Sequence, residues 1–136
     1  MIRAGLCLAA LAAPAAAGPF DGLWRPSPTA DCTRVGGDGG ALKIEGDSFT
    51  GAESTCDLTL PVNVRDMNAV LYDMRCTGEG DEWTQRVLLM TAADGGLIML
   101  LNGFAFKYDA CGADPAVGTV TTSDDIGVAE EAPAAD

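Results

Sequence analysis

The sequence contains no histidine, the residue that most often acts as a general base, a triad member or a zinc ligand. None of the serines beyond residue 17 lies in a Gly-x-Ser-x-Gly or Ser-x-x-Lys setting. Acidic residues are abundant enough for some carboxylates to lie close together by chance, so their nearness alone does not indicate glycoside hydrolysis. We therefore expect a protein that is not an enzyme and that has no catalytic residue and no cofactor.

Basic residues are few. The chain has 8 Lys and Arg residues against 20 Asp and Glu residues, which gives a net charge of −12. Nucleic acids and anionic membrane surfaces are bound through clusters of Lys and Arg, so we expect neither as a partner. The charge is compatible with a basic protein partner or a cation, although net charge by itself mostly governs solubility.

Closely spaced metal ligands are also missing. No two cysteines are fewer than 20 positions apart, whereas a four-thiolate metal site needs pairs such as Cys-x-x-Cys. The acidic stretch at residues 78–82 contains three carboxylates, and a calcium ion takes roughly six to eight oxygen ligands. The sequence therefore predicts a solvated acidic turn there and no metal site.

The first 17 residues have the pattern of a secretory signal peptide. A positive start at residues 1–3 precedes an apolar run at residues 4–13, a proline, and small residues at 15–17. The run is too short to span a bilayer, so we expect no membrane insertion. Bulky Leu6 before Cys7 argues against lipid attachment at that cysteine. We therefore predict an exported chain, periplasmic or secreted, whose mature form begins near Gly18.

Residues 55–77 have the pattern of an antiparallel hairpin that turns near residues 65–67. Pairing residues whose numbers sum to 132 places four pairs on a single face: Cys56 with Cys76, Leu58 with Met74, Leu60 with Tyr72, and Val62 with Val70. On the other face Asp57 meets Arg75 as an opposite-charge pair. A slip of one residue would lose the apolar face, the charge pair and the opposed cysteines together, so we expect this register.

Four cysteines remain after the signal peptide, and an even number in a small exported chain indicates two disulfides. The hairpin register pairs Cys56 with Cys76, which leaves Cys32 to pair with Cys111. When loop-closure entropy is counted, the first bond stabilises the fold by about 3 kcal/mol and the second, with its longer loop, by about 4.5 kcal/mol.

A third hairpin is predicted over residues 83–108, with its turn at Asp94-Gly95. Pairs that sum to 189 place Trp83 by Phe106 on a face that we expect to join the core. The opposite face then carries four large apolar side chains: Leu88, Met90, Met99 and Leu101. A strand face that is exposed to water normally carries fewer large apolar side chains. The face is therefore either covered within the molecule or a candidate interface.

The other segments complete a meander. The glycine-rich residues 31–40 are expected to form a loop, because no helix follows them to build a phosphate site. Ile44 faces Phe49 across a turn at residues 46–47, and a bulge or bend is expected at residues 51–54, where the inward parity changes. We predict an all-β fold, a small antiparallel meander that forms a barrel or sandwich of about six to seven strands, stabilised by two disulfides.

The chain divides into three parts by composition. We expect residues 1–17 to be the signal peptide and residues 18–111 to be the disulfide-linked β domain. Residues 112–136 contain six acids, no basic residue and no aromatic residue. Such a segment buries too little apolar surface to offset the entropy lost on ordering, so we expect an acidic disordered tail.

The stretch Phe20-Asp21-Gly22-Leu23-Trp24, with its Gly-x-Trp pattern, resembles the first strand of lipocalin-like and avidin-like barrels. In those barrels the Trp packs across the floor, often beneath a basic residue from the last strand. The resemblance spans five residues, and it implies that Lys107 takes the part of that basic residue. It also implies a barrel that carries a small ligand.

Three functions stay open. The acidic domain with an apolar outer face predicts a non-enzymatic protein-binding or inhibitor-like module of the bacterial envelope, with an envelope or extracellular protein as its partner. Small exported inhibitors of basic hydrolases such as lysozyme have this general build, but their loop motifs are absent here. The alternatives are a small-ligand carrier and a passive envelope protein without a specific ligand. An empty apolar cavity would favour the carrier, and a filled core with an exposed apolar face would favour the binding module.

Overall fold

The computed structural model describes residues 17–112. The predicted signal peptide, residues 1–17, lies outside the described residues except for residue 17. The predicted tail, residues 112–136, lies outside them except for Gly112. Within residues 17–112 there is no helix that is long and apolar enough to cross a membrane.

Nine β-strands make up the described part of the chain. They are β1 (Gly22–Arg25), β2 (Asp31–Val35), β3 (Gly40–Glu45), β4 (Ser48–Thr50), β5 (Thr55–Asn63), β6 (Ala69–Gly78), β7 (Asp81–Thr91), β8 (Leu97–Leu101) and β9 (Phe104–Ala110). The all-β, mainly antiparallel prediction is confirmed. The number of strands is higher than predicted, because part of the expected glycine-rich loop forms β2 and a turn at Asn102-Gly103 divides the third hairpin into β8 and β9.

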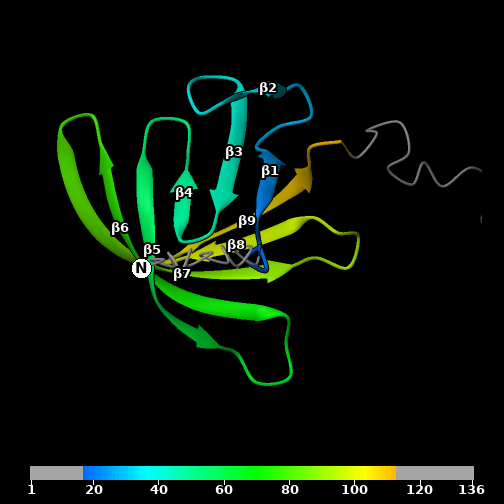
Figure 1. The fold of residues 1–136 in the computed structure, drawn as a ribbon, viewed down its shortest axis with the longest axis vertical. Coiled ribbons are helices and arrows are strands. Elements are labelled where there is room, and N and C mark those ends of the chain that lie inside the picture. Colours follow the sequence, from blue (N-terminus) through cyan, green and yellow to red (C-terminus); the bar gives the residue numbers. More distant parts are fainter. Residues whose placement is uncertain (1–16, 113–136) are drawn as a thin grey trace, which may run out of the picture.

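Eight of the strands close into a barrel (Figure 1). Neighbouring strands pair antiparallel in the order β1-β9-β8-β7-β6-β5-β4-β3, and β1 pairs again with β3 to complete the circle. β2 lies outside this circle and pairs in parallel with β3. Trp24 of β1 is at the point of closure, because it lies opposite Leu42 of β3 and opposite Ala110 of β9.

The β5–β6 hairpin has the predicted register over its first half. Cys56 lies opposite Cys76 and Asp57 opposite Arg75, and this register continues to Thr59. A β-bulge at residues 60–61 then shifts the pairing by one residue. The predicted pairs of Leu60 with Tyr72 and Val62 with Val70 are therefore wrong.

The bulge has a local cause. Leu60 adopts the left-handed region with φ of 53°, and Pro61 has no N–H to donate to the ladder. A proline inside a strand favours such a bulge or an edge position. As a consequence Leu60 and Val62 are 68% and 57% exposed instead of buried.

The β7–β8 pairing is also one residue away from the prediction. Leu88 lies opposite Leu100, and Leu89 opposite Met99. The turn is longer than the expected two residues, because the Ala92 N–H donates to the Gly96 carbonyl at 2.8 Å, and Gly95 has φ of 84°. A three-residue loop with a left-handed residue is among the most common hairpin connections after the two-residue loop.

The predicted second hairpin is confirmed. Ile44 lies opposite Phe49 across the β3–β4 turn. The chain then bends at residues 51–54, where the Gly51 N–H donates to the Ser54 carbonyl at 2.8 Å. After this bend Phe49 lies opposite Cys56, so the change of inward parity is the result of a tight connection between β4 and β5.

Both predicted disulfides are present. The S–S distances are 1.96 Å for Cys32–Cys111 and 2.07 Å for Cys56–Cys76. The first links β2, the strand outside the barrel, to the residue that follows β9. The second lies in the core between β5 and β6. Structural disulfides of this kind indicate an oxidising compartment.

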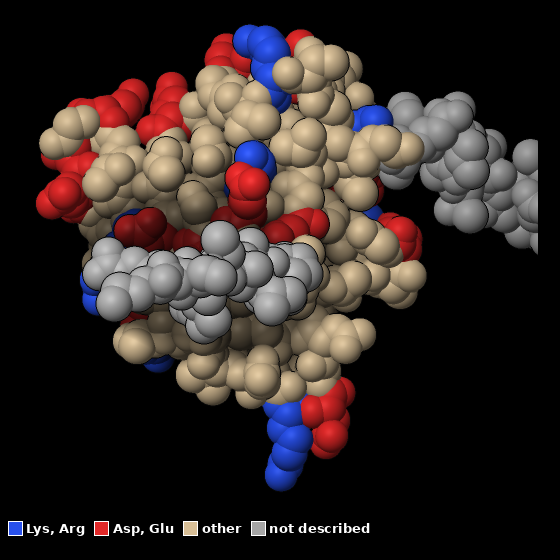
Figure 2. All heavy atoms as spheres, viewed as in Figure 1, with Lys and Arg blue, Asp and Glu red and all other residues tan. Residues whose placement is uncertain are grey.

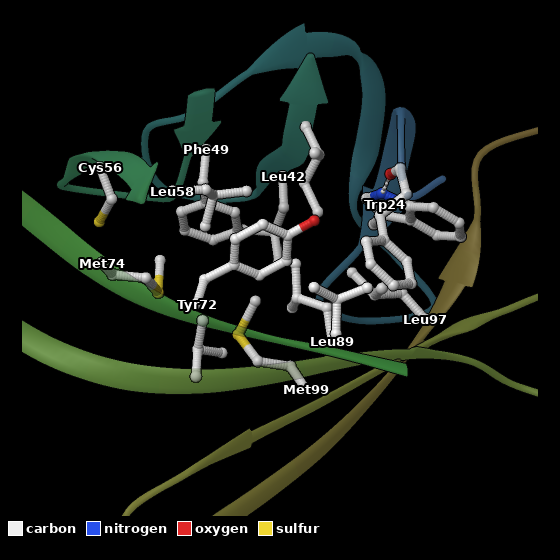
Figure 3. Close-up of a cluster of buried hydrophobic side chains, with 14 of the residues drawn as sticks. Trp24, Leu42, Phe49, Cys56, Leu58, Tyr72, Met74, Leu89, Leu97 and Met99 are labelled. Atoms are coloured by element: carbon white, nitrogen blue, oxygen red, sulfur yellow. Dashed lines mark hydrogen bonds between the residues drawn. The ribbon is translucent and has the colours of Figure 1, made fainter. Parts of the chain in front are cut away.

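Side chains from all parts of the barrel fill its interior (Figure 3). Tyr72, Phe49 and Leu42 converge at its centre with Met99 and Leu89, as the close-up shows. The indole Nε1 of Trp24 donates a hydrogen bond to the Phe20 carbonyl at 3.2 Å, so this buried polar group has a partner. The result is a packed hydrophobic core.

Candidate functional site

An apolar strip crosses the outer face of the barrel. Val62 lies opposite Leu71, Leu71 opposite Leu88, and Leu88 opposite Leu100, on the consecutive strands β5, β6, β7 and β8. We call these four residues the outer strip. Val62 is 57% and Leu100 39% exposed, and Leu71 and Leu88 are partly exposed. Four large apolar side chains in one lateral line are therefore presented to solvent.

The strand periodicity explains why these residues point outward. Their immediate neighbours Val70, Tyr72, Val87 and Leu89 are buried in the core, and successive side chains of a strand point to opposite faces. Val62 lies on the outer face because the bulge at residues 60–61 adds one residue to β5. The side chains after the bulge therefore point to the opposite face from the one that strict alternation predicts.

A second apolar pair lies beside the outer strip. Met90 of β7 faces Ile98 of β8, and both are partly exposed. On the other side of the strip, a shallow depression is lined by Leu71, Leu88 and Leu100 together with Arg86 and Asn102. The apolar surface is therefore continuous across at least two rows of outward residues.

Paired charges flank this apolar surface. The Arg86 Nε donates to the Asp73 Oδ1 at 2.8 Å across β6 and β7. This hydrogen bond lowers the pKa of the Asp73 carboxyl and raises that of Arg86. On the far side, Lys107 contacts Asp94 at 2.6 Å and Asp109 at 3.1 Å, and these bonds raise the pKa of the Lys107 amine. The apolar surface thus lies between two sets of ion pairs, Asp73–Arg86 on one side and Lys107 with Asp94 and Asp109 on the other.

The structure places two of the four residues predicted for the outer apolar face on that face. Leu88 and Met90 lie on the outer face as expected. Met99 does not, because it is 4% exposed and packs in the core, and Leu101 packs against the core as a partly buried residue. The one-residue shift of the β7–β8 register replaces them on the outer face with Ile98 and Leu100.

Two sequence signals mark places where the prediction departs from the structure, although they do not set the strand register by themselves. Asn102-Gly103 is a strong two-residue turn pattern, and it separates Leu100 from the strand that the prediction extended to Tyr108. Pro61 within a predicted strand signals a bulge, and that bulge brings Val62 into the outer strip. Once the bulge is placed at Pro61, Val62 pairs with Leu71, and Leu71 therefore belongs to the outer strip as well.

A row of aromatic side chains extends along the inner face of β9. The ring centroids of Phe104 and Phe106 are 6.3 Å apart, and those of Phe106 and Tyr108 are 6.0 Å apart. Exposure decreases along the row, from 65% at Phe104 to 40% at Phe106, and Tyr108 packs against the core. Burial raises the pKa of the Tyr108 phenol. The row therefore runs from one open end of the barrel toward its interior.

Trp83 was expected in the core beside Phe106, and this is wrong. Trp83 lies opposite Cys76 on β6 and is 39% exposed, because β8 pairs with β7 only from Leu88 onward. Phe106 lies opposite Met99 instead. Both aromatic residues point to the inner face but are partly exposed, and Trp83 lies on the part of β7 that does not pair with β8.

The part that the barrel resemblance implied for Lys107 is not found. Lys107 is on the outer face, opposite Ile98, and is bonded to Asp94 and Asp109. Trp24 is buried as the resemblance implied, but its indole N–H bonds to the Phe20 carbonyl.

Acidic side chains dominate one edge of the molecule. Figure 2 shows them gathered where the β4–β5 and β6–β7 turns lie in Figure 1. Glu53 belongs to the first of these turns and Glu79 to the second, and Asp81 is the first residue of β7. In the part of the chain that the structure describes, no group of three or more acidic or cysteine side chains is arranged to hold a metal ion.

By its fold, the protein is a small disulfide-linked β-protein: a closed antiparallel β-barrel with one additional strand and two disulfides. No protein-family model, curated protein or solved structure matches the chain.

Proposed function

We propose that this protein is a non-enzymatic binding module, exported to the periplasm or secreted, that docks a partner protein through the outer strip. The observation that carries the proposal is the register of Val62, Leu71, Leu88 and Leu100 across four neighbouring strands. Scattered single apolar residues are normal on a protein surface, but a contiguous apolar patch is typical of an interaction site.

The surface is suited to rigid docking. The strip lies on paired strands, and the Cys56–Cys76 disulfide links two of them. Little backbone ordering is therefore needed on binding, so more of the gain from burial, about 25 cal/mol per Å² of apolar area, goes into affinity. The flanking pairs Asp73–Arg86 and Lys107–Asp94 supply a polar rim around the apolar centre, as protein interfaces commonly have.

The packed interior favours this function over that of a small-ligand carrier. A carrier needs interior space, and the centre of this barrel is occupied by Tyr72, Phe49, Leu89 and Met99. A passive envelope protein needs no apolar strip, so the strip also favours the binding module over that alternative.

The test uses the purified mature chain as bait in an envelope extract, with Leu88→Ser and Leu100→Ser combined in a strip variant. Met67→Ser is the matched control, because Met67 is 52% exposed and lies in the β5–β6 turn, away from the strip. We expect the wild-type chain and the control to retain the same protein and the strip variant to lose it while keeping its thermal midpoint within a few degrees.

Equal retention by the folded strip variant would contradict the proposal. If the strip variant unfolds, Leu100→Ser alone decides the matter, because Leu100 is the more exposed of the two residues and its loss disturbs the fold least.

A further inference from the structure

We infer that a second copy of this chain occupies the outer strip, so that two barrels pack the outer faces of β5–β8 together about a two-fold axis parallel to β6 and β7. This inference rests on the proposed function, because it assumes that the strip is a docking surface. It adds the identity of the partner and the geometry of the contact.

The order of the strip is compatible with two-fold symmetry. An axis that runs between β6 and β7 exchanges these strands between the two copies, as in any isologous interface. Leu71 then lies over Leu88 of the second copy, and Val62 lies over Leu100 of the second copy. Each apolar side chain of the strip thus faces an apolar side chain of the second copy, most closely at Leu71 and Leu88 beside the axis.

The neighbouring charged row is self-complementary under the same symmetry. Asp73 and Arg86 are directly opposite each other on β6 and β7. The two-fold exchange therefore places Asp73 over Arg86 of the second copy and Arg86 over Asp73 of the second copy. The Arg86 side chain is 70% exposed and binds Asp73 through Nε alone, which leaves guanidinium N–H groups for another carboxylate.

The alternative two-fold axis, along the strip itself, is less favourable. It would place Arg86 over Met90 of the second copy, and Asp73 over the position of buried Ala69, where the second copy offers no charged partner. Desolvating charges against apolar side chains is unfavourable. Charge complementarity thus selects the axis parallel to the strands.

The available area predicts a weak dimer. β5, β6, β7 and β8 contain 9, 10, 11 and 5 residues. With strands about 4.8 Å apart and a rise of about 3.4 Å per residue, this face spans roughly 600 Å². A standard interface buries roughly 800 Å² per partner. The outer face of a barrel is also convex, so Leu71 and Leu88 near the axis make the closest contact, and we expect reversible association.

The experiment is sedimentation equilibrium of the purified mature chain from about 1 μM to about 1 mM, the range in which weak dimers dissociate. We expect the average mass to rise from one chain toward two. Leu88→Ser and, separately, Arg86→Asp should each raise the dimer dissociation constant at least tenfold. The double charge exchange Asp73→Arg with Arg86→Asp should restore most of the affinity, because it recreates the pairs within and between the copies.

The matched control is Arg34→Asp. Arg34 also forms an exposed ion pair, with Asp31 at 3.2 Å, but it lies on β2, outside the barrel circle, and its substitution changes the net charge by the same amount. We expect it to leave the dissociation constant within twofold of wild type.

A chain that stays monomeric at about 1 mM overturns the inference. The inference also fails if a dimer forms but responds equally to Arg86→Asp and Arg34→Asp. If the chain is monomeric and the envelope extract still yields a protein whose retention depends on the strip, the proposed function stands and only the identity of the partner is wrong. If the dimer behaves as expected, second-copy binding is established whatever the extract yields.

Discussion

Val62 of β5 lies opposite Leu71 of β6, and the two side chains share the outer face of the barrel. The β-bulge at residues 60–61 produces this relationship, because Leu60 takes a left-handed backbone conformation and Pro61 contributes no N–H to the ladder. The bulge thus extends the outer strip from three strands to four.

The first prediction concerns the bulge itself. Leu60 has φ of 53° and is 68% exposed, so its side chain contributes little packing while its backbone is strained. Leu60→Gly should leave the free energy of unfolding unchanged or raise it by up to about 1 kcal/mol, because glycine adopts this conformation without a Cβ clash. Urea unfolding measures the change. Leu58→Ala, which removes a buried side chain two residues away, should lower stability by about 2–4 kcal/mol. A loss above about 1 kcal/mol for Leu60→Gly would show that the residue is not strained.

The two tryptophans should differ in stability and fluorescence. Trp24 is 8% exposed and its indole donates to the Phe20 carbonyl, so Trp24→Phe should lower the free energy of unfolding by about 1–3 kcal/mol. Trp83 is 39% exposed, and Trp83→Phe should change stability by less than about 0.5 kcal/mol. The variant that keeps Trp24 should resist quenching by neutral acrylamide, and the variant that keeps Trp83 should be quenched. Equal quenching of both would contradict the partial exposure of Trp83.

The disulfides should be reduced in a fixed order under native conditions. Cys56 and Cys76 are each 2% exposed, whereas Cys32 and Cys111 are partly exposed. Thiol–disulfide exchange needs access for the attacking thiolate, so a mild reductant should open Cys32–Cys111 first. Alkylation at short times followed by peptide mapping identifies the opened bond. Simultaneous labelling of all four cysteines would mean that reduction proceeds through global unfolding.

The Asp73 carboxyl should titrate below its ordinary range, because Arg86 donates a hydrogen bond to the charged form and lowers its pKa. A depressed pKa in the folded state means that the pair stabilises the fold above the pKa of the unfolded chain. This stabilisation is lost as the pH falls through the folded-state pKa. Carboxyl chemical shifts followed by NMR should show that Arg86→Gln returns the Asp73 pKa toward its usual value.

Asp94 provides the internal control for that titration. Its pKa is lowered by a separate hydrogen bond from Lys107, so Arg86→Gln should leave it unchanged. An unaltered Asp73 titration in the Arg86→Gln variant would show that the Asp73–Arg86 pair is not populated in solution.

The sequence by itself determined the features that depend on local pattern. The parity of Cys56 and Cys76 in one hairpin identified both disulfides, because only one further pair of cysteines remained. The pairing of Ile44 with Phe49 followed from the turn residues between them. An outward apolar face around Leu88 and Met90 followed from strand alternation. Each of these features is set within a short stretch of chain, so a short stretch is enough to predict it.

Only the tertiary structure decided which residues complete the outer face. A loop one residue longer between β7 and β8 moved Met99 into the core and Leu100 to the surface, and the bulge at residues 60–61 moved Val62 outward. Barrel closure through Trp24 joins strands from opposite ends of the described chain. The physical reason is the two-residue period of a strand. A single added residue reverses every side chain that follows, and packing of the whole barrel selects the reversal that buries the larger apolar set.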